Sequence, residues 1–528
     1  MSEEKTKTLE QALWDSADAM RGSMGAANYM NYALGLIFYK YLSDITLERA
    51  ISTLVENGEI KEEENGKKKE YTSEELQEIY TKFYNDEDKR EDLLISMDMD
   101  YTIQPKQTFT YFLQQIKSGK FQLEDLNQAF RDVEQSNAEL LGDLFNDVDL
   151  HSTKLGPTPQ KQNDTISSVM NALAPLTLDS HSGDALGDAY EYLLANFASD
   201  TGTKAGEFFT PQAVSHILTR IVTMGKEDKN GFSIYDPTMG SGSLLLNARK
   251  FIHDPGSIRY YGQELNTTTY NLARMNMILH GVAKTNITLN NGDTLDADWP
   301  MSAETEFDAV VMNPPYSQNW TADKGFLKDS RFADYGVLAP KSKADYAFLL
   351  HGFYHLKASG TMGIVLPHGV LFRGAAEGKI RQKLLEKGYI YAVIGLPANI
   401  FYSTGIPTCI LILKKAREGR DVLFIDASKE FRKDKAQNHM DAEHIDKIVQ
   451  AYKDRKDIDK FARLASFDEI KENDYNLNIP RYVDTFEEEP PVDLDAAFDD
   501  LEKISKEEKE LDVTLNGYFE ELGLEWRL

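Results

Sequence analysis

Cysteine is almost absent from this chain, which has one thiol, Cys409, in 528 residues. A single thiol excludes an internal disulfide framework and is typical of proteins in a reducing compartment. Long apolar runs are also missing, since none approaches the roughly 18 residues that a membrane span needs. The opening residues, MSEEKTKTLEQ, are charged and lack the apolar stretch of a signal peptide. We therefore expect a cytoplasmic protein without a membrane partner.

Positive charge is scarce as well. The chain has 58 basic and 86 acidic residues, which gives a formal net charge of −28. Such a balance repels phosphate, because non-specific affinity for nucleic acid comes mainly from Lys and Arg. A protein of this composition that acts on DNA needs a local basic channel or a partner that grips the duplex. The 41% hydrophobic and 11% aromatic content nevertheless predicts a globular protein rather than a disordered one.

Two segments of different composition make up most of the chain. Residues 1–160 are predicted to form a mostly helical domain, because NYMNYALGLIFYKYLSDI places apolar side chains at helical spacing. Residues 151–165, HSTKLGPTPQKQNDT, have the composition of a linker. Over 165–483, β-rich runs alternate with helical patterns, which predicts an α/β domain with a parallel sheet and helices on both faces. The predicted strands lie in FSIYDP, RYYGQEL, TNITLNNGD, FDAVVMNPP, MGIVLPHGV, IYAVIGLP and TCILILKK.

Residues 484–528 form a third segment, which is acidic. Between Asp484 and Asp512 there are 13 acids and 3 bases. Apolar side chains nevertheless recur at near-helical spacing, at Leu494, Phe498, Leu501, Ile504, Leu511, Leu515 and Phe519. This pattern predicts an amphipathic helical tail, which either folds onto its own domain or docks a partner.

A glycine-rich turn follows the first predicted strand of the α/β segment, in IYDPTMGSGSLLL. Gly240 and Gly242 allow the backbone to approach a ligand closely at the start of a helix. The turn is not a Walker phosphate loop, because no Lys follows its last glycine. It also lacks the third glycine of the dinucleotide fingerprint.

Acidic residues end three successive predicted strands: Asp236, Glu264 and Asp293. Each alone is more often a surface carboxylate or a helix cap. Together they suit a ligand with a ribose and a positive charge, since an acid about 20 residues beyond the glycine turn is placed to bind ribose hydroxyls. S-adenosylmethionine, a cationic sulfonium with a ribose and an adenine, is such a ligand.

The strand Ala309 to Met312 ends in Asn-Pro-Pro-Tyr. An aromatic amine is a poor nucleophile, and two acceptors on its N–H bonds would free its lone pair. The Asn313 side-chain oxygen and the Pro314 carbonyl are candidates, and Pro315 adds no competing N–H. Tyr316 offers a flat face against which a flipped base can stack. This chemistry depends on positioning and requires no metal or general base.

These motifs occur in a recognisable order: AGEFFTPQAV, DPTMGSGSLL, GQEL, NGDTL and NPPY. The chain thus resembles the amino-group DNA methyltransferases of the gamma arrangement. More narrowly, it resembles the modification (M) subunit of bacterial type I restriction-modification systems. Supporting stretches are LEQALWDSADAMRGSM, GDALGDAYEYLLANFA, ADYAFLLHGFYHL, GIVLPHGVLFRG, VIGLPANIFYSTGIPTCILILKK and NDYNLNIPRYV. The likeness extends from about Leu9 to Val483 and implies a Rossmann-like methyltransferase sheet in a bacterial cytoplasmic enzyme.

The resemblance assigns roles to residues of this chain. It implies that Glu264 binds the ribose of S-adenosylmethionine, that Asp293 binds its adenine, and that Asn313, Pro314, Pro315 and Tyr316 hold a flipped adenine for N6 methylation. Phe401, in NIFYSTG, would close the other face of that base. The remaining implied cofactor residues are Glu207, Phe208, Phe209, Thr210, Pro211 and Gln212 at the methionine end, Asp236, and Gly240, Ser241, Gly242 and Ser243 in the glycine loop.

The resemblance also implies partners. A separate specificity (S) subunit would read the sequence of double-stranded DNA, which accommodates the charge of −28. A second M subunit and a restriction and translocation (R) subunit complete such systems. The N-terminal helices would clamp DNA, and the acidic tail would dock the specificity subunit.

Other functions are weighed against this one. Glutamine methyltransferases that act on proteins share Asn-Pro-Pro-Tyr, and a cofactor-binding scaffold without catalysis is a second alternative. Cytosine C5 methylation needs a cysteine nucleophile, whereas Cys409 lies in an apolar strand. A metal site at His351 and His355 rests on spacing alone, and a closed site needs more ligands; we expect none.

Overall fold

A computed structural model shows two compact units, residues 1–483 and residues 484–528, which are described separately. The described residues are 14, 26–61, 63–64, 67–68, 71–176, 178, 183–201, 209–296, 299–300, 305–401, 404–434, 437–486 and 494–524. None of the helices in these ranges is long and apolar enough to cross a membrane.

The first unit begins with helices, as predicted. The long helix α2 (Ala26–Glu56) carries the buried apolar residues of the NYMNYALGLIFYKY stretch. Around it lie a two-stranded hairpin, β1 (Glu63–Glu64) and β2 (Lys67–Lys68), and the helices α3 (Ser73–Tyr84), α4 (Glu87–Met97), α5 (Phe109–Lys117), α6 (Leu123–Ser136) and α7 (Ala138–Leu141). Threonine caps fix two of these helix starts, since Thr72 and Thr108 accept backbone N–H bonds in the first turn.

The predicted linker over 151–165 is wrong. The helix α8 (Pro159–Leu173) begins inside it, with Thr158 as its side-chain cap and proline at its first position. Leu155 and Ile166 are fully buried in the same core as α2. The Pro-rich composition therefore marks a helix start rather than a flexible connection.

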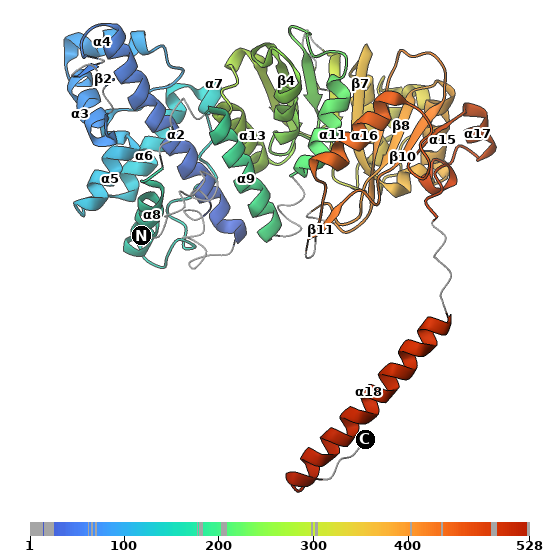
Figure 1. The fold of residues 1–528 in the computed structure, drawn as a ribbon. Helices are drawn as coiled ribbons and strands as arrows, with labels where there is room; N and C mark the ends of the chain where they lie inside the picture. Colours follow the sequence, from blue (N-terminus) through green and yellow to red (C-terminus); the bar gives the residue numbers. More distant parts are fainter. Residues whose placement is uncertain are drawn as a thin grey trace. The chain divides into compact units, whose positions relative to one another are not determined.

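The helical region continues into the α/β region without a break in the core. Helices α9 (Gly183–Thr201) and α13 (Thr267–Leu279) both contact α2. One hydrophobic cluster contains Leu34 of α2, Phe197 of α9 and Met275 of α13. Figure 1 shows the blue N-terminal helices beside these two green helices, at one end of the sheet.

A nine-stranded sheet forms the centre of the α/β region, in the order β13-β10-β8-β9-β7-β6-β3-β4-β5. The seven predicted strands are all present: β3 (Ser233–Asp236), β4 (Arg259–Glu264), β5 (Ile287–Asn291), β6 (Phe307–Met312), β7 (Leu356–Pro367), β8 (Ile390–Gly395) and β9 (Thr408–Leu413). Two further strands, β10 (Val422–Asp426) and β13 (Ala462–Ala465), extend one edge and were not predicted. A short hairpin, β11 (Arg432–Asp434) with β12 (Gln437–His439), lies outside the sheet.

The sheet is mixed rather than parallel, which corrects the prediction. β9 runs antiparallel to both of its neighbours, β7 and β8. A β9 parallel to β8 would need a connection that returns the chain to the edge of the sheet where β8 begins, usually through a helix. Residues 396–407 connect the two strands, and those of them that the structure describes form no helix. β13 is also antiparallel to its neighbour β10, which it follows after helix α16 (Ala442–Asp454) and a short loop.

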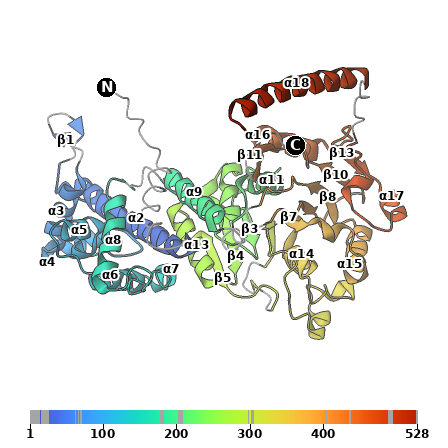
Figure 2. The same cartoon turned by 90° about the horizontal axis from the view of Figure 1, so that it is seen from below.

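Helices cover both faces of the sheet, as predicted. α11 (Gln212–Thr223) and α16 pack on one face, and α14 (Asp345–Tyr354) and α15 (Ala375–Glu386) pack on the other (Figure 2). A short α12 (Ser243–Leu246) follows the glycine turn, and α17 (Phe467–Glu472) follows β13. Because both faces are covered, β6 and β9 are buried along their whole length.

The order of the strands creates a switch point at β3. From β3 the chain proceeds through β4 and β5 in one direction, and β6 and β7 then extend the sheet in the other. Ligands in such sheets bind beyond the carboxyl ends of the strands at this point. The glycine turn after β3 and Asn313 after β6 both lie there, because Ile234 is paired with Ala309.

The second unit contains the helix α18 (Leu494–Glu521), so the helical tail is confirmed as a helix. None of its side chains is buried in this chain. The predicted apolar residues Leu494, Phe498, Leu501, Ile504 and Leu511 are each more than 60% exposed.

Candidate active site

A cavity of about 550 Å³ lies at the switch point of the sheet. Its walls come from the segments that follow β3, β4, β5 and β6, so four strand ends contribute to one site. The lining residues are Thr210, Pro237, Thr238, Met239, Gly240, Glu264, Leu265, Asn266, Thr267, Thr269, Gly292, Asp293, Thr294, Asn313, Pro315, Gln318 and Phe348. We call this the cofactor cavity.

Hydrogen bonds fix the glycine turn beside this cavity. Asp236 accepts the Thr238 backbone N–H at 2.9 Å, which forms a tight turn directly after β3. Glu264 accepts the Gly240 N–H at 3.1 Å and the Asn266 N–H at 2.8 Å. The Glu264 carboxylate therefore ties the turn to the end of β4 while it faces the cavity.

Burial makes both carboxyls weaker acids. It raises the pKa of Asp236 to about 8; the Thr238 hydrogen bonds partly offset this, and the nearby Glu264 carboxylate adds to it. Burial also raises the pKa of Glu264, against the lowering effect of its backbone N–H bonds. Two desolvated carboxyls at one turn favour a cationic ligand, since its charge compensates for their loss of water.

Four of the predicted cofactor residues line the cavity: Thr210, Gly240, Glu264 and Asp293. Asp236, Ser241, Ser243, Phe209 and Pro211 lie beside it without lining it. Glu207 and Phe208 fall outside the described residues.

Two further predicted residues face away from the cavity. The Gln212 side chain donates to Glu191 at 2.7 Å and accepts from Asn247, so it holds α11 against α9. Gly242 has a φ of +79°, and an added Cβ would lie 3.3 Å from the Met277 side chain of α13. The glycine at 242 is needed for its left-handed conformation and for close packing against α13.

A second cavity, of about 370 Å³, lies on the other side of Asn313. Its walls combine the Asn-Pro-Pro-Tyr turn with the loops that follow β7 and β8. The lining residues are Asn313, Pro314, Pro315, Tyr316, Ser317, Gln318, Pro367, Phe401, Thr404 and Ile406. We call this the target cavity, and it contains all five predicted catalytic residues.

The two predicted aromatic residues meet across the target cavity. The rings of Tyr316 and Phe401 lie 6.1 Å apart at an interplanar angle of 82°. Tyr402, the other aromatic residue of NIFYSTG, lies outside the described residues. An edge-to-face pair at this distance is a stable aromatic contact and leaves the face of one ring available to a base.

Asn313 lines both cavities, and its amide is fixed at both ends. Its nitrogen donates to the Thr210 hydroxyl at 3.1 Å, and its oxygen accepts the Tyr316 hydroxyl at 2.8 Å. Asp345, which is fully buried, accepts the Ser317 N–H at 2.8 Å and pairs with Arg373. The turn after β6 is therefore held rigidly at the junction of the two cavities.

The residues of the cofactor cavity fit S-adenosylmethionine. A volume of about 550 Å³ is in the range of small-molecule sites. Glu264 and Asp293 supply carboxylates at the positions expected for a ribose and an amino group, and Leu265 and Phe348 supply apolar surface. Among the described residues that line the cavity there is no cluster of basic side chains, which suits a nucleoside without phosphates.

Sequence reasoning missed several lining residues. Leu265 is 58% exposed at the cavity although it is large and apolar, and it directly follows Glu264. Such exposure at a strand end is the one feature that could have identified it. Gln318, Phe348, Thr404 and Ile406 come from loops and a helix that only the tertiary fold brings together.

The weighed alternatives at Cys409, His351 and His355 can be compared with the structure. Burial raises the pKa of the Cys409 thiol, which lies in β9 and donates to the Leu366 carbonyl. One ring nitrogen of His351 is hydrogen-bonded to the Tyr235 hydroxyl and the other to the Arg331 guanidinium. A ring nitrogen of His355 is hydrogen-bonded to the Thr305 carbonyl. Among the described residues no group of three or more His, Cys, Asp or Glu could hold a metal ion.

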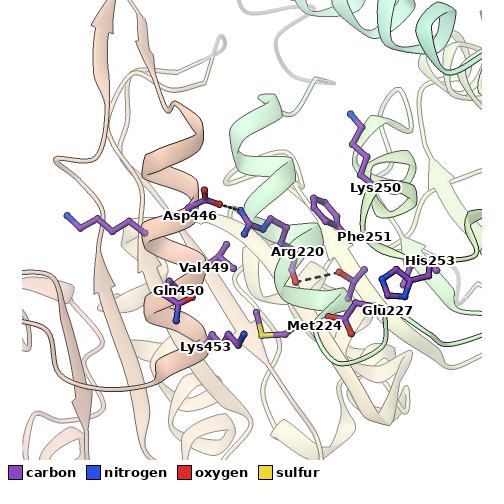
Figure 3. A pocket seen from close by; sticks show the side chains of 13 residues that line it. Arg220, Met224, Glu227, Lys250, Phe251, His253, Asp446, Val449, Gln450 and Lys453 are labelled. Carbon is purple, nitrogen blue, oxygen red and sulfur yellow. Dashed lines mark hydrogen bonds and ion pairs between the residues drawn. The ribbon is translucent and has the colours of Figure 1, made fainter.

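A larger hollow of about 750 Å³ lies between α11 and α16 (Figure 3). Arg220 and Asp446 form an ion pair across it. Lys250, Lys453 and Glu227 also line it. None of its lining residues lines the cofactor or target cavity.

Known proteins resemble this chain over nearly its whole length. A family model described as N-6 DNA Methylase matches residues 181–490, and one described as the HsdM N-terminal domain matches residues 9–173. The type I restriction enzyme MpnII methylase subunit of Mycoplasma pneumoniae is 34% identical over 99% of this chain and 98% of its own length. The MjaVIII methylase subunit of Methanocaldococcus jannaschii is 34% identical over 76% of this chain and 70% of its own length.

A solved structure is more similar still. The methyltransferase subunit of a type I restriction-modification system from Streptococcus thermophilus is 59% identical, with a TM-score of 0.86. The similarity covers 90% of this chain and 99% of that one.

Proposed function

Because this chain belongs to the N-6 DNA methylase family, as one of its type I restriction enzyme methylase subunits, we propose how its two cavities divide the work of an adenine-specific DNA methyltransferase. The cofactor cavity holds S-adenosylmethionine and the target cavity holds the flipped adenine. Family membership does not favour the two alternatives, a protein glutamine methyltransferase and a silent scaffold.

The observation that carries this proposal is the position of Asn313, which lines both cavities. S-adenosylmethionine, when bound, supplies an electrophilic methyl group on a positively charged sulfur. The Asn313 side-chain oxygen and the Pro314 carbonyl accept the two N–H bonds of the adenine amine. These bonds draw the nitrogen toward tetrahedral geometry, which directs its lone pair at the cofactor cavity.

The Tyr316 hydroxyl already donates to the Asn313 oxygen. A carbonyl oxygen has two lone pairs, so one remains for the amine. The Tyr316 ring stacks on one face of the base, and Phe401, which meets Tyr316 edge to face in this structure, closes the other face once the entering base has separated the two rings. Stacking offsets part of the few kcal/mol that unpairing a base costs.

Charged groups orient the cofactor within its cavity. Glu264 accepts hydrogen bonds from the ribose hydroxyls and Asp293 accepts one from the adenine amino group. Thr210 and the glycine turn border the methionine end, and Leu265 packs on the adenine ring. Asp236 acts indirectly, because it shapes the turn through Thr238.

Double-stranded DNA requires positive charge near the target cavity. The loop 317–344, which begins at that cavity, has five bases and three acids in a chain that is otherwise strongly acidic. Lys324, Lys328 and Lys341 on this loop are exposed and suited to contact phosphates. We assign most of the grip on DNA to partners, namely a specificity subunit, a second M subunit with its N-terminal helices, and an R subunit.

The test uses S-adenosylmethionine labelled in its methyl group. The chain is assayed alone and with its co-expressed specificity subunit, on unmodified DNA, and both digested nucleosides and protein are counted. We expect label in N6-methyladenine only when the partner is present. Label in protein would replace the proposal with the glutamine alternative, and binding without transfer would replace it with a scaffold.

The tail gives a second test. Its helix α18 exposes an apolar stripe that suits docking of the specificity subunit. Deletion of residues 490–528 should release that subunit on gel filtration, while the remaining chain keeps its melting temperature and its affinity for cofactor. A complex that stays intact after the deletion would remove the tail from the docking surface.

A further inference from the structure

Three side chains form a directed chain of hydrogen bonds between the two cavities. The Tyr316 hydroxyl donates to the Asn313 oxygen, and the Asn313 nitrogen donates to the Thr210 hydroxyl oxygen. Tyr316 lines the target cavity, Thr210 lines the cofactor cavity, and Asn313 lines both. Every donor in this chain points toward the cofactor cavity.

The last hydrogen of the chain is available to a ligand. Thr210 is only 8% exposed, and its oxygen receives the Asn313 N–H. Among the residues that the structure describes, none accepts the Thr210 O–H. This donor borders the cofactor cavity, so an acceptor atom on a bound ligand would complete its hydrogen bonding.

We propose that Thr210 is a positioning residue that couples occupancy of the cofactor cavity to the acceptor strength of Asn313. When a ligand accepts the Thr210 O–H, the Thr210 oxygen becomes a stronger acceptor for the Asn313 N–H. Donation by that N–H polarises the amide and places more negative charge on the Asn313 oxygen. The oxygen that grips the target amine is thus strongest when the cofactor is present.

The same hydroxyl also fixes the orientation of the amide. An asparagine can present either its oxygen or its nitrogen to a ligand, and the two ends have opposite hydrogen-bonding roles. When a bound ligand accepts the Thr210 O–H, only the oxygen lone pairs of Thr210 remain for the amide, so Thr210 accepts the Asn313 N–H and the Asn313 oxygen faces Tyr316 and the target cavity. A residue without a hydroxyl at 210 would leave the buried N–H unsatisfied and would allow the amide to turn over.

This inference rests on the proposed function, and its test separates the two. Thr210→Val removes the hydroxyl at nearly constant volume, and Thr210→Ser keeps it. Thr219→Val is the matched control, because it removes a buried threonine hydroxyl from α11 that bonds only within the helix. Each full-length variant is purified with its specificity subunit and assayed on unmodified DNA at saturating S-adenosylmethionine, and cofactor affinity is measured by calorimetry.

We expect Thr210→Val to lower kcat roughly 10- to 100-fold, which is the effect of leaving a buried donor unpaired. The KM for DNA should change much less, and Thr210→Ser should recover most of the loss. Thr219→Val should match the wild type in kcat. Melting temperatures identify any variant that fails to fold, and Thr210→Ser keeps the test decisive in that case.

Two results would overturn the inference. One is a kcat of Thr210→Val within about twofold of the wild type. The other is an equal loss in Thr210→Val and Thr210→Ser, which would show that volume rather than the hydroxyl matters. Failure of the wild-type complex itself to methylate adenine would instead refute the proposed function.

Discussion

The two cavities that meet at Asn313 differ in how they are built. The cofactor cavity is lined mostly by strand ends, whose polar groups are fixed by hydrogen bonds such as those that Glu264 accepts from Gly240 and Asn266. The target cavity joins one turn, at residues 313–318, to loops almost a hundred residues away, at Phe401 and Ile406. Two carboxylates, Glu264 and Asp293, distinguish the first cavity, whereas prolines and the rings of Tyr316 and Phe401 distinguish the second.

This difference predicts that substitutions separate into two classes. Changes in the carboxylates of the cofactor cavity should alter cofactor affinity, since these charged groups are already in place. Changes in the target cavity should alter turnover or DNA binding and leave cofactor affinity intact. Asn313 lines both cavities, so its substitution is the strictest test of whether effects on turnover and on cofactor affinity are separate.

The largest effect is expected for Asn313→Ala. Loss of one positioned acceptor at the reacting amine should lower kcat on the order of 10²- to 10³-fold, by analogy with the loss of one oxyanion-hole donor. Cofactor affinity, measured by calorimetry, should stay close to that of the wild type. Near-normal turnover would contradict the proposed activation of the amine. Loss of cofactor affinity would show that substitutions in the two cavities do not have separate effects.

Glu264→Gln, in the cofactor cavity, should alter cofactor affinity rather than turnover. Hydrogen bonds to a charged group contribute about 1.5–3 kcal/mol, so we expect roughly a 10- to 150-fold weaker affinity for S-adenosylmethionine. Turnover at saturating cofactor should fall far less. Glu227→Gln in the hollow between α11 and α16 is the matched control and should leave affinity unchanged; equal effects of the two substitutions would show that only overall charge matters.

Phe401→Ala tests the second face of the base. Stacking of a base on an aromatic ring is worth roughly 1–3 kcal/mol, which predicts an increase of about 5- to 150-fold in the KM for DNA. Cofactor affinity should not change, because Phe401 lines only the target cavity. An unchanged KM would assign the stacking face to another residue.

The smallest expected effect is the contribution of Asp236 to the pH dependence of the protein's stability. Its pKa is raised to about 8, so the folded protein retains a proton that the unfolded chain has lost. Stability should therefore decrease as the pH rises from the ordinary range of a carboxyl to about 8. In Asp236→Asn the melting temperature should fall less between about pH 5 and pH 9 than in the wild type, whereas Asp468→Asn, at an exposed site, should keep the wild-type slope.

The sequence predicted the lining of the target cavity more completely than that of the cofactor cavity: all five predicted catalytic residues line the first, but only four of the predicted cofactor residues line the second. Asp236, Glu264 and Asp293 end strands, and apolar runs locate strand ends well. The roles within the turn were less predictable: Gly242 faces α13 and Gln212 faces α9, because side-chain direction depends on tertiary packing. Ile406 and Thr404 have no local pattern that could place them at the target cavity.

For the fold, the types of element were predicted correctly, whereas the direction of some strands was not. Alternation of strands and helices indicated the α/β region and the covering of both faces. The direction of β9 was not predicted, because it depends on a connection without a described helix rather than on the strand itself. The boundary near residue 160 was misplaced, since proline at the first turn of α8 was interpreted as part of a linker.

The antiparallel strand β9 also bears on how the chain is made. It is inserted between β7 and β8 and provides hydrogen bonds to both. During synthesis these two strands leave the ribosome first, and each presents an open edge until residues 408–413 emerge. The two parts of the sheet therefore join only after more than three quarters of the protein has been translated. Until then both edges are open to pairing with other chains, which makes this stage of synthesis the one most exposed to aggregation.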